Sequence, residues 1–228
     1  MTILGKYLAP AGVALLALAA LPAQAQVEGR MATVDISGTI IGTTAFQNAY
    51  TEVNRTYSQQ NELRRTKAQE RQTLLATFDT NGDKQVDDNE LAAKQGSADM
   101  TKLQTLEQEI QALSNQIDSA RIYAIEQIIT QYPAALQQVT TSQQIKMIID
   151  PGSILYAPPE ADITQQVVTA LNAKVATATV VPPAGWQPSR EGVQIFQEIQ
   201  QRLMAAAQQQ AQQQQQQQQG ATAAPVGR

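Results

Sequence analysis

The chain contains no cysteine and no histidine among its 228 residues. These two absences exclude disulfide bonds, thiol nucleophiles, zinc sites of the Cys/His type and the Ser–His–Asp triad. Aromatic residues are also scarce, at 4% of the sequence. A composition with few aromatics and abundant glutamine is typical of an elongated helical protein with a modest core. We therefore expect no enzymatic activity and no catalytic residues.

Charge and long apolar runs are limited as well. The formal net charge is −4, and a chain with that balance is not expected to bind nucleic acid. The only leading apolar run, Ala11–Leu21, is too short to span a bilayer. It follows Lys6 and precedes the small-x-small sequence Ala23-Gln24-Ala25, which is the pattern of a secretory signal peptide. We predict that residues 1–25 are removed after Ala25 and that the mature protein is periplasmic and not membrane-spanning.

The central stretch 43–132 has the clearest pattern. Its second half places apolar residues three and four apart, with polar residues between them, and this spacing predicts a helix that buries one narrow stripe against a partner helix. The stripe consists of Leu103, Leu106, Ile110, Leu113, Ile117, Ala120 and Ala124. The first half begins similarly with Phe46, Tyr50, Val53 and Tyr57, which we interpret as seam packing. It then continues through Gln60, Arg64, Lys67 and Arg71, so its middle should pack loosely.

Two helices of equal length joined by a loop form an antiparallel hairpin. The expected helices, 43–77 and 98–132, would each be roughly 50 Å long. Such an arm buries too little surface to be a domain, so the flanks must form a body. We predict an α+β, mainly α fold in which a coiled-coil hairpin projects from a small sheet-containing body made of residues 26–42 and 133–187.

The flanks carry the signals for that body. Short strands are predicted at 30–37, 145–150, 153–156 and 176–181, with 38–42 as a turn or irregular entry into the arm. Pro133 should interrupt or kink the returning helix. Asp162, with Gln165 three residues later, indicates a capping-box-like start for a helix through Ala173.

Residues 188–228 are predicted to be a separate tail. Ser189–Ala207 has the pattern of an amphipathic helix, and the glutamine tract that follows should fray or be mobile. The tract either recruits partners through coiled-coil pairing or has no specific role. Trp186, in a proline-rich linker, either marks a docking motif or is an anchor that folds back on the body.

The order of these blocks resembles the Skp/OmpH family of periplasmic chaperones. Two blocks carry the resemblance: RMATVDISGTIIGTTAFQNAY, at 30–50, and VTTSQQIKMIIDPGSILYAPPEADITQQVVTALN, at 139–172. The similarity covers roughly Arg30 to Val175. It implies a homotrimer whose three arms surround a cavity, and an ATP-independent holdase that keeps unfolded outer-membrane β-barrel proteins from aggregating. Members of that family are basic, whereas this chain is acidic.

A second motif lies between the two predicted helices of the arm. The sequence FDTNGDKQVDDNEL resembles an EF-hand calcium loop, which takes oxygen ligands from positions one, three, five, seven, nine and twelve. The corresponding residues are Asp79, Asn81, Asp83, the carbonyl of Gln85, Asp87 and Glu90. Lys84 stands at the sixth position, where glycine is expected, and a left-handed backbone there costs roughly 1–2 kcal/mol.

Two interpretations of residues 79–90 therefore stay open. In the first, the loop binds calcium weakly, with an affinity of roughly 10⁻⁴–10⁻³ M. In the second, it is an acidic cap that keeps the arm tips soluble and apart. Two functions also stay open for the whole chain. One is the trimeric holdase, and the other is a structural or calcium-responsive coiled-coil interaction protein of the periplasm without client-holding activity.

Overall fold

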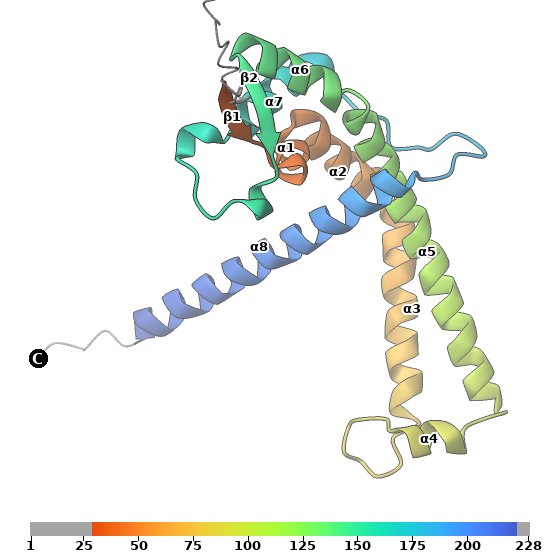
Figure 1. Cartoon of the computed structure of the whole chain (residues 1–228). Coiled ribbons are helices and arrows are strands. Elements are labelled where there is room, and N and C mark those ends of the chain that lie inside the picture. The colour runs from red at the N-terminus through yellow and green to blue at the C-terminus, as the bar shows by residue number, and fades with distance from the viewer. Residues whose placement is uncertain (1–28, 223–228) are drawn as a thin grey trace, which may run out of the picture.

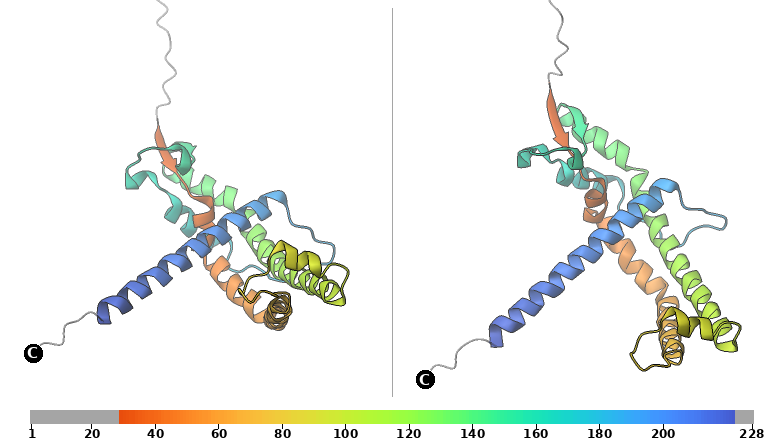
Figure 2. Two further views of the ribbon diagram at one scale, coloured as in Figure 1. Left: turned by 90° about the horizontal axis from the view of Figure 1, so that it is seen from below. Right: turned by 60° about the horizontal axis from the view of Figure 1, so that its bottom comes forward.

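The structure of the chain, a computed structural model, describes residues 29–222. The predicted signal peptide and residues 223–228 lie outside the described residues. The fold is α+β and mainly helical, with a long hairpin standing on a small body, as predicted (Figure 1). In the views of Figure 2 the hairpin and the C-terminal helix extend from the body in different directions.

The hairpin forms the arm. Its outbound half is α2 (Thr44–Thr56) followed by α3 (Ser58–Ala76), and its return half is α5 (Ala98–Ile129). The short helix α4 (Asp88–Ala93) lies at the tip. The two outbound helices are separated at Tyr57, whose backbone has φ −104° and ψ 26°. Tyr57 N–H donates to the Val53 carbonyl of α2 and the Tyr57 carbonyl accepts the Asn61 N–H of α3, both at 2.9 Å, so the outbound half remains almost continuous.

The body is built from residues on both sides of the hairpin. A parallel pair of strands, β1 (Arg30–Thr33) and β2 (Ile145–Ile149), forms its sheet. Helices α1 (Ile36–Gly42), α6 (Tyr132–Ser142) and α7 (Thr164–Lys174) pack beside it. Two 3₁₀ turns, η1 (Pro151–Ser153) and η2 (Pro159–Ala161), connect β2 to α7. Pro133 lies in the first turn of α6, where its missing N–H costs no helical hydrogen bond. The returning helix is interrupted just before this proline, between α5 and α6, as predicted.

Several local predictions were wrong. Residues 38–42 are helical, because the Asp35 carboxylate accepts the Gly38 N–H at 2.9 Å and thereby starts α1. Residues 153–156 form no strand, since Asp150 accepts the Gly152 N–H at 2.7 Å and turns the chain away from the sheet. Residues 176–181 are also irregular.

The predicted capping box at the start of α7 is absent. Asp162 instead accepts both the N–H and the hydroxyl of Thr164, at 2.8 and 2.5 Å. The helix begins at Thr164. Its N-cap residue, Ile163, makes no side-chain hydrogen bond to the first turn. The predicted helix is therefore present, but its start is set by an Asp–Thr turn.

One hydrophobic core joins the body to the base of the arm. Ile125 and Ile128, near the end of α5, are fully buried in it together with Leu171 of α7. The N-terminal strand contributes Ala32, and α1 contributes Ile40. Because these residues come from opposite ends of the sequence, the arm is fixed in the body by packing and not by a flexible connection.

The C-terminal helix α8 (Arg190–Thr222) is longer than the amphipathic helix predicted over 189–207, because it continues through the glutamine tract. Its first turns belong to the core, where Ile195 and Ile199 are buried. Ser37 donates to Glu198 at 2.6 Å, and Arg202 pairs with Asp35. From Gln201 to Gln215 every described side chain is exposed, and Figure 1 shows this half projecting away from the body.

Candidate functional site

The arm packs tightly at its base and loosely along its middle. No residue of α3 is buried, in agreement with the predicted polar seam. On α5, Leu103 and Leu106 are buried near the tip, and the next buried residue along the helix is Ile117. An α-helical pair held by few apolar contacts opens at a low free-energy cost. We call the hairpin between Tyr57 and the tip loop the lower arm. It is therefore the most deformable helical part of the hairpin.

Ion pairs bridge this loosely packed region. Lys67 Nζ lies 2.7 Å from Glu109 Oε2, and Arg71 Nε lies 3.1 Å from Glu107 Oε1. The four side chains are all at least one-fifth exposed. Pairs of this kind contribute at most about 1 kcal/mol each. They set the register of the two helices without locking them together.

The aromatic residues of the outbound half pack at the base of the arm: Phe46 belongs to the core shared with the body, and Tyr57 to the cluster between α2 and α5. Phe46 and Tyr57 are buried, and the rings of Phe46 and Tyr50 lie 4.1 Å apart. Burial raises the pKa of Tyr50 to about 12, and the nearby Arg121 guanidinium offsets this only in part. These rings stabilise the base of the arm and are not free to contact a partner.

The backbone of the tip loop follows the course that the EF-hand pattern predicts. Lys84 has φ +66°, which is the left-handed conformation expected at the sixth position of the loop. Gly82 is also left-handed, at φ +79°. A lysine in this conformation carries a backbone strain that glycine would not.

Three of the predicted ligand side chains bind the loop's own backbone. Asp79 accepts the N–H groups of Gly82 and Lys84, at 2.6 and 2.8 Å. Asn81 accepts the Asp83 N–H at 2.8 Å, and Asp83 accepts the Gln85 N–H at 2.8 Å. These short-range bonds curl residues 79–85 into a compact turn.

The last two side chains of the predicted set are engaged in the same way. Asp87 caps α4 by accepting the N–H groups of Asn89 and Glu90, both at 2.9 Å. Glu90 is 7% exposed and lies across the loop. Its Oε1 accepts the N–H and hydroxyl of Thr80, at 2.7 and 2.8 Å, and the Asn81 N–H at 3.2 Å. Its Oε2 accepts the Asp87 N–H at 3.2 Å.

These contacts bear on the predicted metal ligands. Within residues 29–222, no three acidic side chains lie close enough together to hold a metal ion as they stand. The carboxylates satisfy backbone donors instead, so a cation would have to compete with those hydrogen bonds. The ligand set Asp79, Asn81, Asp83, Gln85, Asp87 and Glu90 stays a prediction.

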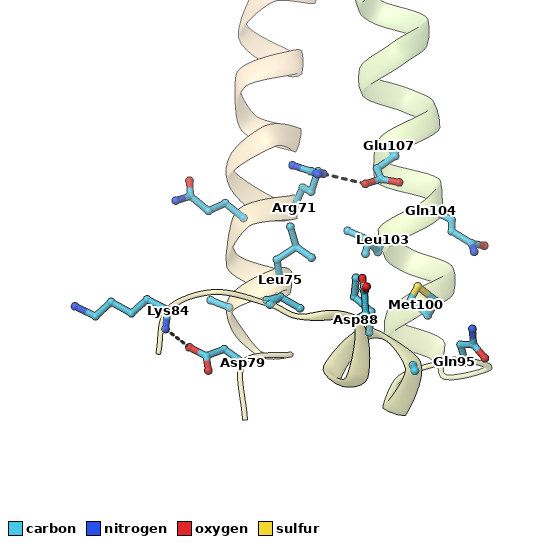
Figure 3. A pocket seen from close by; sticks show the side chains of 15 residues that line it. Arg71, Leu75, Asp79, Lys84, Asp88, Gln95, Met100, Leu103, Gln104 and Glu107 are labelled. Carbon is cyan, nitrogen blue, oxygen red and sulfur yellow. Dashed lines mark hydrogen bonds and ion pairs between the residues drawn. The ribbon is translucent and has the colours of Figure 1, made fainter. Parts of the chain in front are cut away.

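A hollow of about 1040 Å³ lies between the arm helices and the tip loop (Figure 3). Leu75, Met100 and Leu103 form its apolar wall, and the Arg71–Glu107 pair lies at its upper edge. Figure 3 shows the Lys84 side chain extending away from this space. The hollow gives the tip an apolar surface that the sequence pattern did not indicate.

Two other features of the arm were missed from the sequence. Thr80, which holds Glu90, occupies a position that the calcium-loop pattern leaves unspecified. The pairing of Lys67 with Glu109 requires the register of the hairpin, and that register follows only when the turn is placed. Charge complementarity between the two predicted helices was the signal that was available.

The fold and the arm define a protein class: a long, loosely packed helical hairpin rooted in a small mixed body. The sequence profile of the family described as "Outer membrane protein (OmpH-like)" matches residues 30–171. The chain belongs to this OmpH-like family, and membership confirms the expectation that it is not an enzyme. No helix in the described part of the chain has the length and apolarity that crossing a membrane would require.

Several solved structures are similar to the chain. One of them is a crystal structure of a candidate outer membrane chaperone (OmpH-like) from Caulobacter crescentus CB15. The identity is 16% and the TM-score is 0.37, with 68% of this chain and 91% of that chain covered. Among curated proteins, none matches the chain.

The hydrogen bonds of Glu90 predict a pH dependence of the tip. Donation from the Thr80 backbone, and then from its hydroxyl, lowers the pKa of Glu90 below its ordinary value of about 4.5. A lowered pKa means that Glu90 stabilises the folded loop above its unfolded pKa, and that this stabilisation is lost as pH falls through the folded value. The amide resonances of Thr80 and Asn81 should therefore shift in NMR spectra between about pH 6 and about pH 3.

Two variants control for other carboxylates. Glu90→Gln should remove the acid transition at these amides, whereas Asp88→Asn, an exposed neighbour, should leave it in place. Unmoved Thr80 and Asn81 resonances across this range in the unmodified chain would contradict the role given to Glu90.

Proposed function

We propose that the chain is an ATP-independent periplasmic holdase that binds unfolded outer-membrane β-barrel proteins between its arms. Membership of the OmpH-like family is the observation that carries this proposal. The predicted signal peptide agrees with it, because a periplasmic chaperone must be exported. No chemical step is required of the protein.

The construction of the arm supports holding without folding. A client chain that is to remain unfolded must be bound by many weak contacts that do not impose one conformation. The lower arm offers half-buried leucines, exposed polar side chains and an apolar hollow at its tip. Since α3 buries no residue, the arm deforms at small cost to follow the shape of a client.

We also propose that the protein assembles as a homotrimer through its body. The body exposes large apolar side chains, with Leu155 fully exposed and Tyr156 85% exposed. Met31 of β1 is 55% exposed and Met147 of β2 is 39% exposed. A two-stranded sheet is marginally stable alone, and open strand edges pair readily with other chains. Packing between copies would cover this apolar surface.

The acidic charge of the chain affects how clients are captured. With a net charge of −4, the protein cannot attract acidic clients over long distances as a basic chaperone does. Capture would then depend more on apolar and amide contacts than on steering. The acidic tips would repel one another and keep the cavity open.

We further propose that the tip binds calcium weakly. The spacing of oxygen ligands and the left-handed backbone at Lys84 support this proposal. Because Glu90 and Asp87 already accept backbone hydrogen bonds, calcium binding must release part of them, and the affinity should be low.

A second candidate function is a structural or calcium-responsive coiled-coil interaction protein that holds no client. The observation that favours it is the projecting half of α8, which carries no charge from Leu203 to Thr222. In that case calcium would change the association of the chain, whereas the holdase would remain a trimer in either condition.

The holdase activity predicts protection of a client from aggregation. Mature protein in molar excess should suppress the turbidity of a β-barrel protein diluted from urea, because arm contacts sequester its apolar segments. A variant in which residues 60–113 are replaced by a short glycine-rich turn should form the same body and lose this protection. Unchanged turbidity with the full-length arm would contradict the holdase.

The body surface predicts an association equilibrium. Replacing Leu155 and Tyr156 together by serine removes two exposed apolar side chains, so sedimentation should show a shift from trimer toward monomer. Leu63→Ser is a matched control, since Leu63 is 47% exposed on the arm. A monomeric unmodified chain, or a double variant that remains trimeric, would argue against this interface.

Calcium binding predicts a measurable stabilisation. With a dissociation constant of about 10⁻³ M, about 10 mM calcium should stabilise the calcium-binding conformation by about 1.4 kcal/mol. Calorimetric titration should give heat for the mature protein and for Asp99→Asn, a control in the first turn of α5. Asp79→Asn should give none. Absence of heat from the unmodified protein at millimolar calcium would leave the loop as an acidic cap.

A further inference from the structure

The segment 176–189 lies beyond the part of the chain that matches the family, which ends at residue 171. It has no regular secondary structure and connects α7 to α8. Figure 1 shows it looping out beside the upper part of α5, where the arm leaves the body. Its contacts with the arm are nevertheless specific, and they come from four of its residues, the last of which directly precedes α8.

Val180 is the apolar anchor of this segment. It is 5% exposed, whereas the next residue, Val181, is 61% exposed. The hydroxyl of Tyr57 donates to the Val180 carbonyl at 3.4 Å. Val180 completes a second buried cluster at the base of the arm, which consists of Ala49, Val53, Tyr57, Ile117, Ala120 and Ala124. This cluster joins α2 to α5.

Gln127 of α5 forms hydrogen bonds with Thr179, the residue before Val180. Its Nε2 donates to the Thr179 carbonyl at 2.9 Å. Its Oε1 accepts the Thr179 N–H at 3.0 Å and the Thr179 hydroxyl at 3.1 Å. One side-chain amide thus satisfies both backbone groups of Thr179, as a neighbouring strand would.

Glu126 fastens the other end of the segment. Its Oε2 accepts the indole N–H of Trp186 at 3.2 Å, and its Oε1 accepts the Ser189 N–H at 2.6 Å. The Trp186 ring packs edge-on against Tyr123, with 5.3 Å between the centroids. Trp186 therefore folds back onto the chain, at the base of the arm and not in a docking motif.

These anchors lie along α5 from Ile117 to Gln127, and Val180 also reaches Tyr57 at the end of α2. Beyond Tyr57, α3 buries no residue. We infer that residues 176–189 form a strap that holds the base of α5 against α2 and fixes the angle between arm and body. Bending is thereby confined to the arm below Tyr57. The inference does not depend on whether the chain holds a client.

The strap can be tested in the full chain with spin labels, because the protein has no cysteine of its own. Gln95→Cys near the tip and Gln137→Cys on α6 are both exposed positions. Their distance distribution contains the bending of the arm, which is common to all variants, so a difference between variants reports the angle between arm and body, once labelled chains are diluted with unlabelled ones. Trp186 is the only tryptophan in the sequence, so its emission reports release of the strap.

Val180→Asp should release the strap, shift Trp186 emission to the red and broaden the distance distribution. Val181→Asp is the matched control and should change neither, because Val181 is already exposed. Should Val180→Asp lose its helical circular dichroism, the double variant Glu126→Ala, Gln127→Ala removes the polar anchors and is judged by the same two readouts.

Three results would overturn the inference. One is a red-shifted Trp186 emission with an unchanged distance distribution, which would mean that the arm angle is fixed without the strap. Another is an unshifted emission in a folded anchor variant, which would show that these contacts do not hold the segment. The last is equal broadening by Val181→Asp.

Discussion

The burial of the last turns of α5 in the body is the contact on which the rest of the structure depends. Ile125 and Ile128 are fully buried among side chains from β1, α1, α6, α7 and α8. A hairpin of this length cannot stabilise itself, since helices gain most of their stability from packing an apolar face. Because the broad buried face of α5 lies at its C-terminal end and only Leu103 and Leu106 are buried near the tip, the arm is firm at its base and held by fewer apolar contacts beyond it.

The same contact explains why elements far apart in the sequence are needed together. The two-stranded sheet is too small to fold independently. Helix α7 has one apolar face, which needs a partner to cover it. Packing them around α5 forms one core from both sides of the hairpin, and α8 extends that core with Ile195 and Ile199. The arm toward the tip, by contrast, is held by Leu103, Leu106 and exposed ion pairs. This gradient suits the proposed holding of unfolded clients, because the arm can deform while the core keeps the fold.

Features governed by periodicity could be predicted from the sequence. The spacing of Leu103, Leu106 and Ile117 identified the return helix, and the change to arginine and lysine in the outbound half predicted its loose seam. Features governed by one hydrogen bond could not be predicted. Gly38 lies in a helix because Asp35 caps it, and residues 153–156 leave the sheet because Asp150 turns the chain.

The tip shows the limit of a ligand pattern. The spacing identified the loop and its left-handed residue. It does not predict which carboxylates accept hydrogen bonds from backbone N–H groups of the loop. Glu90 therefore serves the loop itself through Thr80 and Asn81. Val180 was missed for a similar reason: within a run of alanine, threonine and valine, nothing in the pattern separates the buried valine from the exposed one.

Amide hydrogen exchange along α5, measured residue by residue on the intact protein, is the most direct test of the graded arm. Protection should be high from Ile117 to Ile128, lower toward Ala98, and low throughout α3. Packing into the body stabilises the first region, whereas the other two depend on weak contacts. Uniform protection along both halves of the hairpin would mean that the arm is a rigid rod, and would contradict the central claim.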